Sequence, residues 1–277
     1  MPEDKTLKGS GHVYAFPEDR QLLEDIARQA GQLALRYFNR DPEVWTKGNN
    51  SPVTEADIAV DRFLKKVLLE ARPEYGWLSE ESEDDKIRLD KQRVFVVDPI
   101  DGTRAFIDGG SEWTISLAIV EDHRPVAGVL FAPVRGEMYT ASRFGGATLN
   151  GVKLTCPRLA SLDGARAAGP RPAIAKGPLA RAGVRNAGYI RSLAYRIVMV
   201  TTGALDLALA REGAHDWDIA AADLIVEEAE GVLRDKSNRV LRYNRASVKH
   251  DSLYASCRAL GRLAAPCMPT LHFPQRR

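Results

Sequence analysis

The chain has 277 residues, of which 44% are hydrophobic and 27% are charged, a composition typical of a globular protein with a substantial core. Its formal net charge of +2 indicates neither a nucleic-acid polymer nor a membrane surface as a partner. No apolar run reaches the roughly 18 residues of a membrane helix, and residues 1–12 lack the apolar core of a signal peptide. We therefore expect a cytoplasmic protein with no integral membrane association, in which the basic ends at residues 5–8 and 273–277 are solvated tails.

The three cysteines, Cys156, Cys257 and Cys267, do not have the spacing of a metal site, and an odd number cannot pair completely. We interpret them as free thiols in a reducing compartment. They therefore predict no disulfide framework.

The first part of the chain predicts two helices separated by a loop. Apolar residues recur at helical spacing over residues 18–38 and again over residues 54–71, where Thr54 precedes the first turn. Residues 39–52 are rich in Asn, Pro and Gly and predict the loop between them.

A series of β-strands is predicted next. His123-Arg124 marks the turn of a hairpin, and Asn150-Gly151 is typical of a tight turn. The predicted strands lie at residues 93–97, 114–122, 125–133, 136–142 and 147–154.

The second half alternates helices and strands. Residues 159–188 are rich in Ala, Gly, Pro and Arg, and we expect an irregular surface region there with one strand, RPAIA, at residues 171–175. The remaining predicted elements are helices at residues 189–211, 216–231 and 258–264 and strands at residues 231–235 and 251–256. Gly231 is interpreted as the stop of the second of these helices. The pattern predicts an α/β fold of mixed helix and sheet layers with a soft boundary near residue 155.

Two acids end the apolar strand in the stretch RVFVVDPIDGTRAF at residues 93–106. A carboxylate in a dry site is costly unless it is paired or binds a metal, and oxygen ligands at a strand end suit a hard cation, which makes Asp98 and Asp101 candidate ligands. Gly102 allows the backbone to approach a ligand closely, and the N–H groups of Gly102 and Thr103 would face an anion if a helix begins there. The alternative is a solvated turn that binds nothing.

Other acids also follow apolar segments. Each has a simpler interpretation: Glu81 as a surface charge, Asp216 or Asp218 as a helix cap, and Asp57 as the third residue of a capping box. Together with Glu80, however, such acids recur at several apolar-to-acid transitions of one chain. The recurrence favours a shared acidic site.

The spacing of the central acids bears on mechanism. DPIDGT is similar to the D-x-D-x-T signature of haloacid dehalogenases, in which the first Asp is phosphorylated. In that signature the acids are two residues apart, whereas Asp98 and Asp101 are three apart. The spacing therefore argues against an aspartyl-phosphate intermediate.

Taken together, these motifs resemble the inositol monophosphatase superfamily of magnesium-dependent, lithium-sensitive phosphomonoesterases. VVDPIDGT at residues 96–103 is similar to its central D-P-[IL]-D-G-T motif, and LSEES at residues 78–82 is similar to its acidic loop. SPVTEAD at residues 51–57 resembles its V-T-x-A-D element, and DWDIAAADLIVEEAEG at residues 216–231 resembles its W-D-x-A-A helix. Glu230 departs from the usual glycine of that helix.

The resemblance implies a layered αβαβα sandwich of the inositol monophosphatase and fructose-1,6-bisphosphatase type, commonly a homodimer. Residues 1–155 would form an N-terminal half that carries most metal ligands, and residues 156–277 a C-terminal half that completes the active site. The implied magnesium ligands are the carboxylates of Glu80, Asp98, Asp101 and Asp218 and the main-chain oxygen of Ile100.

The implied reaction is direct attack by water. Asp57, Thr103 and Glu80 would orient the water, and the N–H groups of Gly102 and Thr103 would hold the phosphate. Two or three Mg²⁺ ions would lower the pKa of that water and neutralise the phosphate, with no phosphoenzyme.

The substrate is less sharply indicated. RSLAYR at residues 191–196 resembles the Ser-Leu-Lys-Phe of bisphosphate nucleotidases, although Ala194 replaces the Lys, and DGTRAF also occurs in histidinol-phosphatases. Arg211 stands near the position where inositol phosphatases carry an acid, with Glu212 beside it. A 3′(2′),5′-bisphosphate nucleotidase is favoured, with an inositol-1-monophosphatase or a histidinol-phosphatase as alternatives. The residues expected around a second phosphate are Ser192, Arg191, Arg196 and Arg211.

Solvated surface arginines are the simpler interpretation of these basic residues.

Functions of two other classes fit the sequence less well. A metal-dependent nuclease would require a basic patch with interleaved aromatic residues, which the sequence lacks. A non-catalytic regulator with the same fold is disfavoured because acids occupy each expected position.

Overall fold

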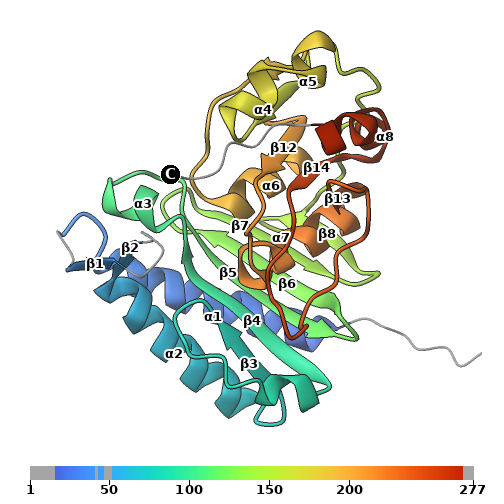
Figure 1. The fold of residues 1–277 in the computed structure, drawn as a ribbon. Coiled ribbons are helices and arrows are strands. Elements are labelled where there is room, and N and C mark those ends of the chain that lie inside the picture. Colours follow the sequence, from blue (N-terminus) through green and yellow to red (C-terminus); the bar gives the residue numbers. More distant parts are fainter. Residues whose placement is uncertain (1–15, 41–42, 47–51, 271–277) are drawn as a thin grey trace, which may run out of the picture.

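The structure is a computed structural model that describes residues 16–40, 43–46 and 52–270 (Figure 1). The predicted basic ends and part of the predicted loop at residues 39–52 lie outside the described residues. No helix of the described ranges combines the length and apolarity that crossing a membrane requires.

A seven-stranded sheet forms the centre of the first half of the chain. Its first two strands are parallel, and each later pair is antiparallel. The strands, in their order across the sheet, are β3 (Gly76–Ser79), β4 (Arg93–Asp101), β5 (Thr114–Glu121), β6 (Arg124–Ala132), β7 (Glu137–Ser142), β8 (Gly146–Leu149) and β9 (Val152–Lys153).

Helices cover both faces of this sheet. One face packs against α1 (Pro17–Leu35) and α2 (Glu55–Ala71), and the other against α6 (Leu193–Thr202) and α7 (Asp216–Glu228). Along β4, Phe95 and Val97 join the core beneath α1 and α2, whereas Val94 and Val96 join the core beneath α6 and α7. Residues 94–97 of the strand are all apolar because both of its faces are buried there.

A five-stranded sheet lies on the other side of α6 and α7. Its strands, in spatial order, are β11 (Arg185–Asn186), β10 (Arg166–Ala168), β12 (Leu207–Ala210), β14 (Leu253–Cys257) and β13 (Gly231–Asp235). Residues of α4 (Arg171–Ala175), α5 (Pro178–Arg181) and α8 (Arg258–Ala264) form a further core with its outer face. The resulting helix, sheet, helix, sheet and helix layers confirm the predicted αβαβα sandwich.

Smaller elements complete the fold. They are β1 (Val44–Thr46), β2 (Pro52–Thr54), α3 (Thr103–Ile107) and the 3₁₀ helices η1 (Ile87–Asp90) and η2 (Ala265–Thr270). The largest core combines residues from both sides of the predicted boundary near residue 155. The division into residues 1–155 and 156–277 therefore stays a prediction.

Two predictions in the second half of the chain were wrong. Residues 171–175 form the helix α4 and not a strand, because Pro172 near the helix start lacks only an N–H that the first turn does not use. The strands of the predicted irregular region, residues 159–188, are β10 and β11 instead. Residues 189–211 do not form one helix, because α6 ends before Gly203, which has φ +73°, and residues 207–210 form β12. Their Leu and Ala favour helices intrinsically, but burial between β10 and β14 overrides that preference.

Two turns also differ from their prediction. The hairpin between β5 and β6 turns at Asp122 and His123, which have φ +49° and +63°, so Arg124 already belongs to β6. At the end of α7, Glu230 is the left-handed residue, with φ +67°, and Gly231 begins β13. A Cβ atom at Gly231 would lie 2.6 Å from Val226 Cγ1, so this glycine is required by close packing and not by a helix stop.

Replacing Glu230 by glycine should stabilise the protein. A left-handed backbone costs a residue with a Cβ atom about 1 kcal/mol relative to glycine, so Glu230→Gly should raise the free energy of unfolding by about that amount. Urea denaturation measures the change. The matched control, Glu70→Gly on the exposed face of α2, should lower the free energy of unfolding by about 1 kcal/mol. A loss of stability in Glu230→Gly would contradict the role given to this turn.

Candidate active site

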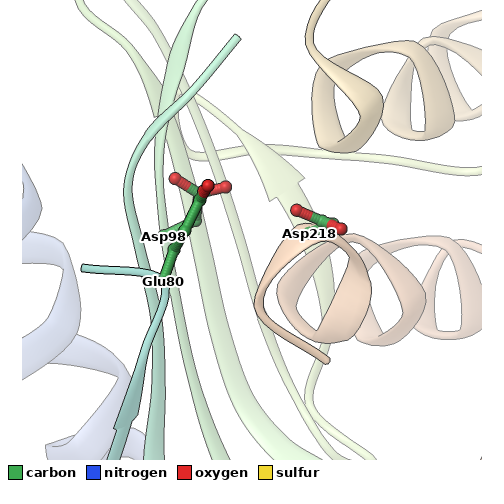
Figure 2. Close-up of side chains that lie close together, drawn as sticks. All are labelled: Glu80, Asp98 and Asp218. Carbon is green, nitrogen blue, oxygen red and sulfur yellow. The ribbon is translucent and has the colours of Figure 1, made fainter. Parts of the chain in front are cut away.

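Three carboxylates converge where the seven-stranded sheet meets α7. One oxygen each of Glu80, Asp98 and Asp218 lies within 4.8 Å of the others (Figure 2). Glu80 follows β3 directly, and its N–H donates to the carbonyl of Val97 on the parallel neighbour β4 (3.2 Å), which places it beside Asp98. Asp218 arrives from the first turn of α7.

A bulge in β4 explains the three-residue spacing of Asp98 and Asp101. On the partner strand β5 their pairing residues, Ser116 and Thr114, are only two positions apart, so β4 contains one extra residue. The N–H of Ile100 donates to Asp98 Oδ1 (3.1 Å) within this bulge. In a regular strand, residues three apart point to opposite faces, whereas the extra residue lets both acids approach one site.

Asp101 is held by the start of α6. Its carboxylate accepts hydrogen bonds from the N–H groups of Ala194 (2.8 Å) and Leu193 (3.2 Å) and from the hydroxyl of Ser192. Ser192 is fully buried and also caps α6 by accepting from the N–H of Tyr195. Asp101 lies outside the group of three converging carboxylates, although it is close enough to Asp98 and Asp218 to affect their electrostatics.

The predicted capping box of Asp57 is present, and the same side chain reaches the site. Asp57 Oδ2 accepts from the N–H (2.8 Å) and the hydroxyl (2.6 Å) of Thr54, while Oδ1 accepts from Thr103 Oγ1 (3.3 Å). The carbonyl oxygen of Ile100, 3.2 Å away, is the alternative acceptor for the single hydroxyl hydrogen of Thr103. The cap therefore fixes the orientation of the Asp57 carboxylate toward Thr103.

The turn between β4 and α3 depends on Gly102. Its φ is +94°, and a Cβ atom there would lie 3.0 Å from the carbonyl oxygen of Glu112 and 3.1 Å from Ser192 Cβ. Both the backbone conformation and the crowding favour glycine. This turn brings Thr103 to the start of α3, beside Asp57.

The two acids of DWD have different surroundings. Asp218 Oδ2 accepts from the N–H of His215 (2.6 Å) in a capping box, and the side chain also belongs to the acidic cluster. Asp216 is buried and contacts His250 Nε2 (2.7 Å) and the N–H of Asn244 (2.7 Å). Asp216 is thus an anchor for residues 244–250.

Asp61 is a functional neighbour that the sequence analysis missed. It lies one turn after Asp57 on α2 and is buried, and its carboxylate accepts from the hydroxyls of Ser79 and Ser82, which flank Glu80 in the chain. An acid on the buried stripe of a helix, one turn after another candidate, was the signal available in the sequence.

The electrostatics of the cluster indicate a cation. Burial raises the pKa of Asp98 well above its ordinary value, and the charges of Glu80, Asp101, Asp218 and Glu81 raise it further. The pKa of Asp101 is raised to about 6 by burial and by Asp218, against the opposing effect of its hydrogen bonds. Carboxylate oxygens gathered at this spacing fit a hard divalent cation such as Mg²⁺, whose charge would offset their repulsion.

The predicted arginines lie around α6 and β12 in different environments. Arg191 is exposed and contacts the Asp108 carboxylate and the carbonyl of Arg104. Arg196 is only 3% exposed, donates to the carbonyl of Ile190 (2.6 Å) and lies 5.0 Å from the ring centroid of Tyr189. Arg211 is half-buried just after β12.

Comparison with solved structures supports the fold. The Thermotoga maritima IMPase superposes with a TM-score of 0.80 at 25% sequence identity, covering 91% of this chain and 97% of that one. The chain therefore has the α/β sandwich fold of the IMPases, with a cluster of acids whose chemistry fits a metal ion.

Comparison with protein families identifies the chain further. The model of the inositol monophosphatase family matches residues 18–265, and the chain belongs to this family. It is 30% identical to the 3′(2′),5′-bisphosphate nucleotidase CysQ of Aggregatibacter actinomycetemcomitans (81% of this chain, 88% of the relative). It is 33% identical to the inositol-1-monophosphatase of Rhizobium meliloti (73% and 80%) and 30% identical to the histidinol-phosphatase of Chlorobaculum parvum (88% and 94%). The protein is therefore a phosphatase, a phosphoric monoester hydrolase.

Metal binding should stabilise the protein more at neutral than at acidic pH. The folded-state pKa of Asp101, about 6, exceeds the ordinary 3.8, so the protonated carboxyl contributes stability below that ordinary value and the contribution is lost as the pH rises through about 6. Mg²⁺ should restore it, so the rise in Tm on adding Mg²⁺ to EDTA-treated protein should be larger near pH 7.5 than near pH 5.

Thermal unfolding at both pH values, with and without Mg²⁺, makes the measurement. Asp223 also has a pKa raised to about 6 by burial, but it contacts Tyr243 and not the cluster. The pH dependence that Asp223 adds to Tm should therefore be the same with and without Mg²⁺, and it cancels when the two Tm values at one pH are subtracted. An equal or larger Mg²⁺ effect near pH 5 would show that the cluster does not bind the ion.

Proposed function

We propose that the protein is a Mg²⁺-dependent phosphomonoesterase that hydrolyses a small phosphorylated metabolite by direct attack of water. The observation that carries the proposal is the convergence of the Glu80, Asp98 and Asp218 carboxylates at the edge of a bulged strand. Bound by these residues, by Asp101 and by the Ile100 carbonyl, Mg²⁺ would lower the pKa of a water molecule and neutralise the phosphate.

The surrounding residues orient the reactants. Thr103 Oγ1 faces the Asp57 carboxylate. Its hydroxyl can therefore donate a hydrogen bond to Asp57 while its oxygen accepts one from the attacking water. Glu80 would hold the same water from the other side. The Gly102 and Thr103 N–H groups, at the left-handed turn into α3, would donate to the phosphate oxygens.

The proposed substrate is a 3′(2′),5′-bisphosphate nucleotide. Arg191 and Arg211 are accessible to a ligand beside α6 and β12, and a guanidinium binds a phosphate through charge-assisted, often bidentate, hydrogen bonds. Arg196 is buried and holds the Ile190 carbonyl next to Ser192, so it would support that wall and not touch the ligand. An inositol phosphate or histidinol phosphate is the alternative, because relatives with those activities are about as similar.

Removing one carboxylate charge should abolish activity and keep the fold. Asp98→Asn leaves a poorer metal ligand and should lower kcat/KM by at least about a hundredfold, equivalent to roughly 3 kcal/mol. It also removes a repelled charge, so the metal-free protein should unfold at an equal or higher temperature than wild type. The matched control, Asp25→Asn on the exposed face of α1, should leave both measurements unchanged. Undiminished turnover by Asp98→Asn would refute the proposed centre.

Substrate preference should follow the second phosphate. One partly desolvated arginine–phosphate contact is worth about 1.5–3 kcal/mol, so kcat/KM for 3′-phosphoadenosine 5′-phosphate should exceed that for inositol 1-phosphate about ten- to a hundredfold. Arg191→Ala and Arg211→Ala should lower the first value selectively, whereas Arg196→Ala should lower both. Arg185→Ala, on the exposed edge strand β11, is the control. A preference for inositol 1-phosphate would replace the nucleotidase proposal by the inositol phosphatase alternative.

Two further properties belong to the proposal through the family resemblance. The enzyme would be inhibited by Li⁺, which the same phosphatase assay tests. It would form a homodimer in the cytoplasm, and light scattering of the purified protein measures its mass in solution.

A further inference from the structure

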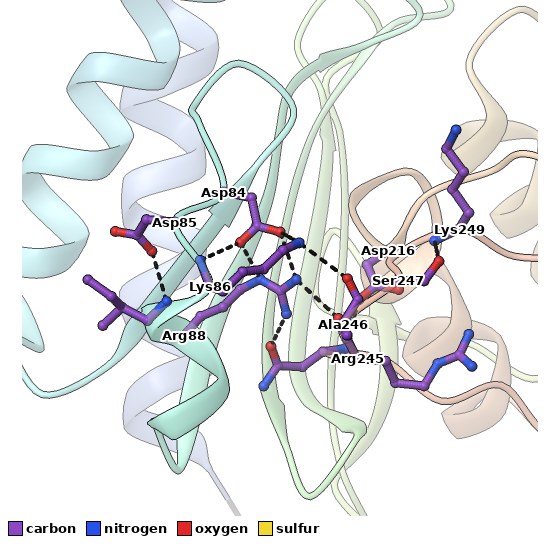
Figure 3. Close-up of polar contacts among 11 residues, drawn as sticks. Asp84, Asp85, Lys86, Arg88, Asp216, Arg245, Ala246, Ser247 and Lys249 are labelled. Carbon is purple, nitrogen blue, oxygen red and sulfur yellow. Dashed lines mark hydrogen bonds and ion pairs between the residues drawn. The ribbon is translucent and has the colours of Figure 1, made fainter.

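Residues 244–250 form a bridge between the two elements that deliver metal ligands. We refer to these residues as the bridging segment. Its first residues face the acidic loop at residues 80–88, which begins with Glu80, and the whole segment runs along the start of α7, which carries Asp218 (Figure 3). Hydrogen bonds join this segment both to the acidic loop and to the start of α7.

On the side of the acidic loop, Lys86 Nζ donates to the carbonyl of Ala246 (3.2 Å), and the other contacts converge on Arg88. Its side chain is fully buried, and its guanidinium donates to both oxygens of Asp84 (2.9 and 2.8 Å). The same group donates to Asn244 Oδ1 (2.6 Å) and to the carbonyl of Arg245 (3.1 Å). Burial opposes ionisation of Asp84, but its bonds with Arg88 and Lys86 outweigh that effect and lower its pKa to about 2, so Asp84 is charged over the working pH range. Arg88 therefore joins the acidic loop to the bridging segment.

On the side of α7, the contacts converge on Asp216. Its two carboxylate oxygens take the N–H of Asn244 (2.7 Å) and the Nε2 of His250 (2.7 Å), which lie near the two ends of the bridging segment. The N–H of Asp216 donates to the carbonyl of Val248 (2.9 Å). Asn244 thus bonds to Arg88 through its side chain and to Asp216 through its backbone.

Side-chain packing between the acidic loop and the start of α7 is incomplete. A pocket of about 430 Å³ lies there, bordered by Glu80 and Asp84 of the loop, by Trp217 of α7 and by Val248 of the bridging segment. The carboxylates of Glu80 and Asp218 are close together, and their charged forms repel each other. The bonds between the acidic loop and the bridging segment oppose this repulsion.

We infer that Arg88 is a positioning residue that sets the affinity of the acidic cluster for Mg²⁺, acting through Asn244 and Asp216 on the spacing of Glu80 and Asp218. The inference rests on the proposed metal-dependent function. Asp61 holds the Glu80 loop to α2 through Ser79 and Ser82, whereas Arg88 supplies the tie toward α7. Groups that orient metal ligands typically change metal affinity about 10- to 100-fold when removed.

The experiment measures Mg²⁺ binding by calorimetry alongside steady-state kinetics. Arg88→Lys keeps the positive charge but loses the planar guanidinium that bonds to Asp84, Asn244 and Arg245 at the same time. Asn244→Gly loses the acceptor for Arg88, and glycine keeps the left-handed backbone of this position (φ +49°). Both variants should raise the Kd for Mg²⁺ about tenfold, while kcat at saturating Mg²⁺ stays within about threefold of wild type. Asn244→Asp keeps an oxygen acceptor and should bind Mg²⁺ within about twofold of wild type.

Arg72→Lys is the matched structural control. Arg72 makes a part-buried pair with Asp19 that joins the far end of α2 to α1, away from the cluster. It should lower stability and leave the Kd for Mg²⁺ unchanged. If Arg88→Lys does not fold, Asn244→Gly alone carries the test.

The inference is overturned if both bridging variants bind Mg²⁺ as wild type does, or if Arg72→Lys weakens binding equally, since general loosening would then be the cause. Failure of the proposed function has a different signature. Wild-type protein would bind no Mg²⁺ in calorimetry, which removes the basis of the inference as well.

Discussion

The constraint on which the structure depends is the mutual repulsion of buried carboxylates. Burial and neighbouring charges both raise the pKa of Asp98, so the folded chain gathers acids where their charged forms are least favourable. Such a cluster persists only if the scaffold opposes the repulsion and a cation offsets it. The sandwich meets the first requirement by supplying the acids from elements that are buried on both faces, β4 between two helical layers and α7 between two sheets.

Several of the acids are also held by local hydrogen bonds that would exist without any ligand. Asp57 and Asp218 complete capping boxes at the starts of α2 and α7, and Asp101 accepts from the start of α6. The capping and the functional interpretations of these residues are therefore compatible. A cap fixes the rotamer of a carboxylate, and a fixed rotamer reduces the entropy lost when a metal binds.

The residues proposed to set specificity lie in less constrained parts of the molecule. The acids belong to β-strands and helix starts in the cores, whereas Arg191 and Arg211 are exposed or half-buried beside the wall of α6 and β12. Substitutions there cost little stability, so relatives at about 30% identity can act on different substrates, as the names of three of them indicate.

Much of the fold and of the acidic centre was predictable from the sequence by itself, because the signals are local. The 3.6-residue periodicity marked α1 and α2, the apolar run at residues 93–97 marked β4, and Asp98 directly follows that run. Tertiary structure decided what depends on contacts between distant residues. It made residues 207–210 a strand, because burial between β10 and β14 outweighs the helix preference of Leu and Ala. The bond between Arg88 and Asn244 also depends on tertiary structure, because the two residues are far apart in the chain. The same is true of the bulge in β4 that lets Asp98 and Asp101 approach one site, because it is set by pairing with β5.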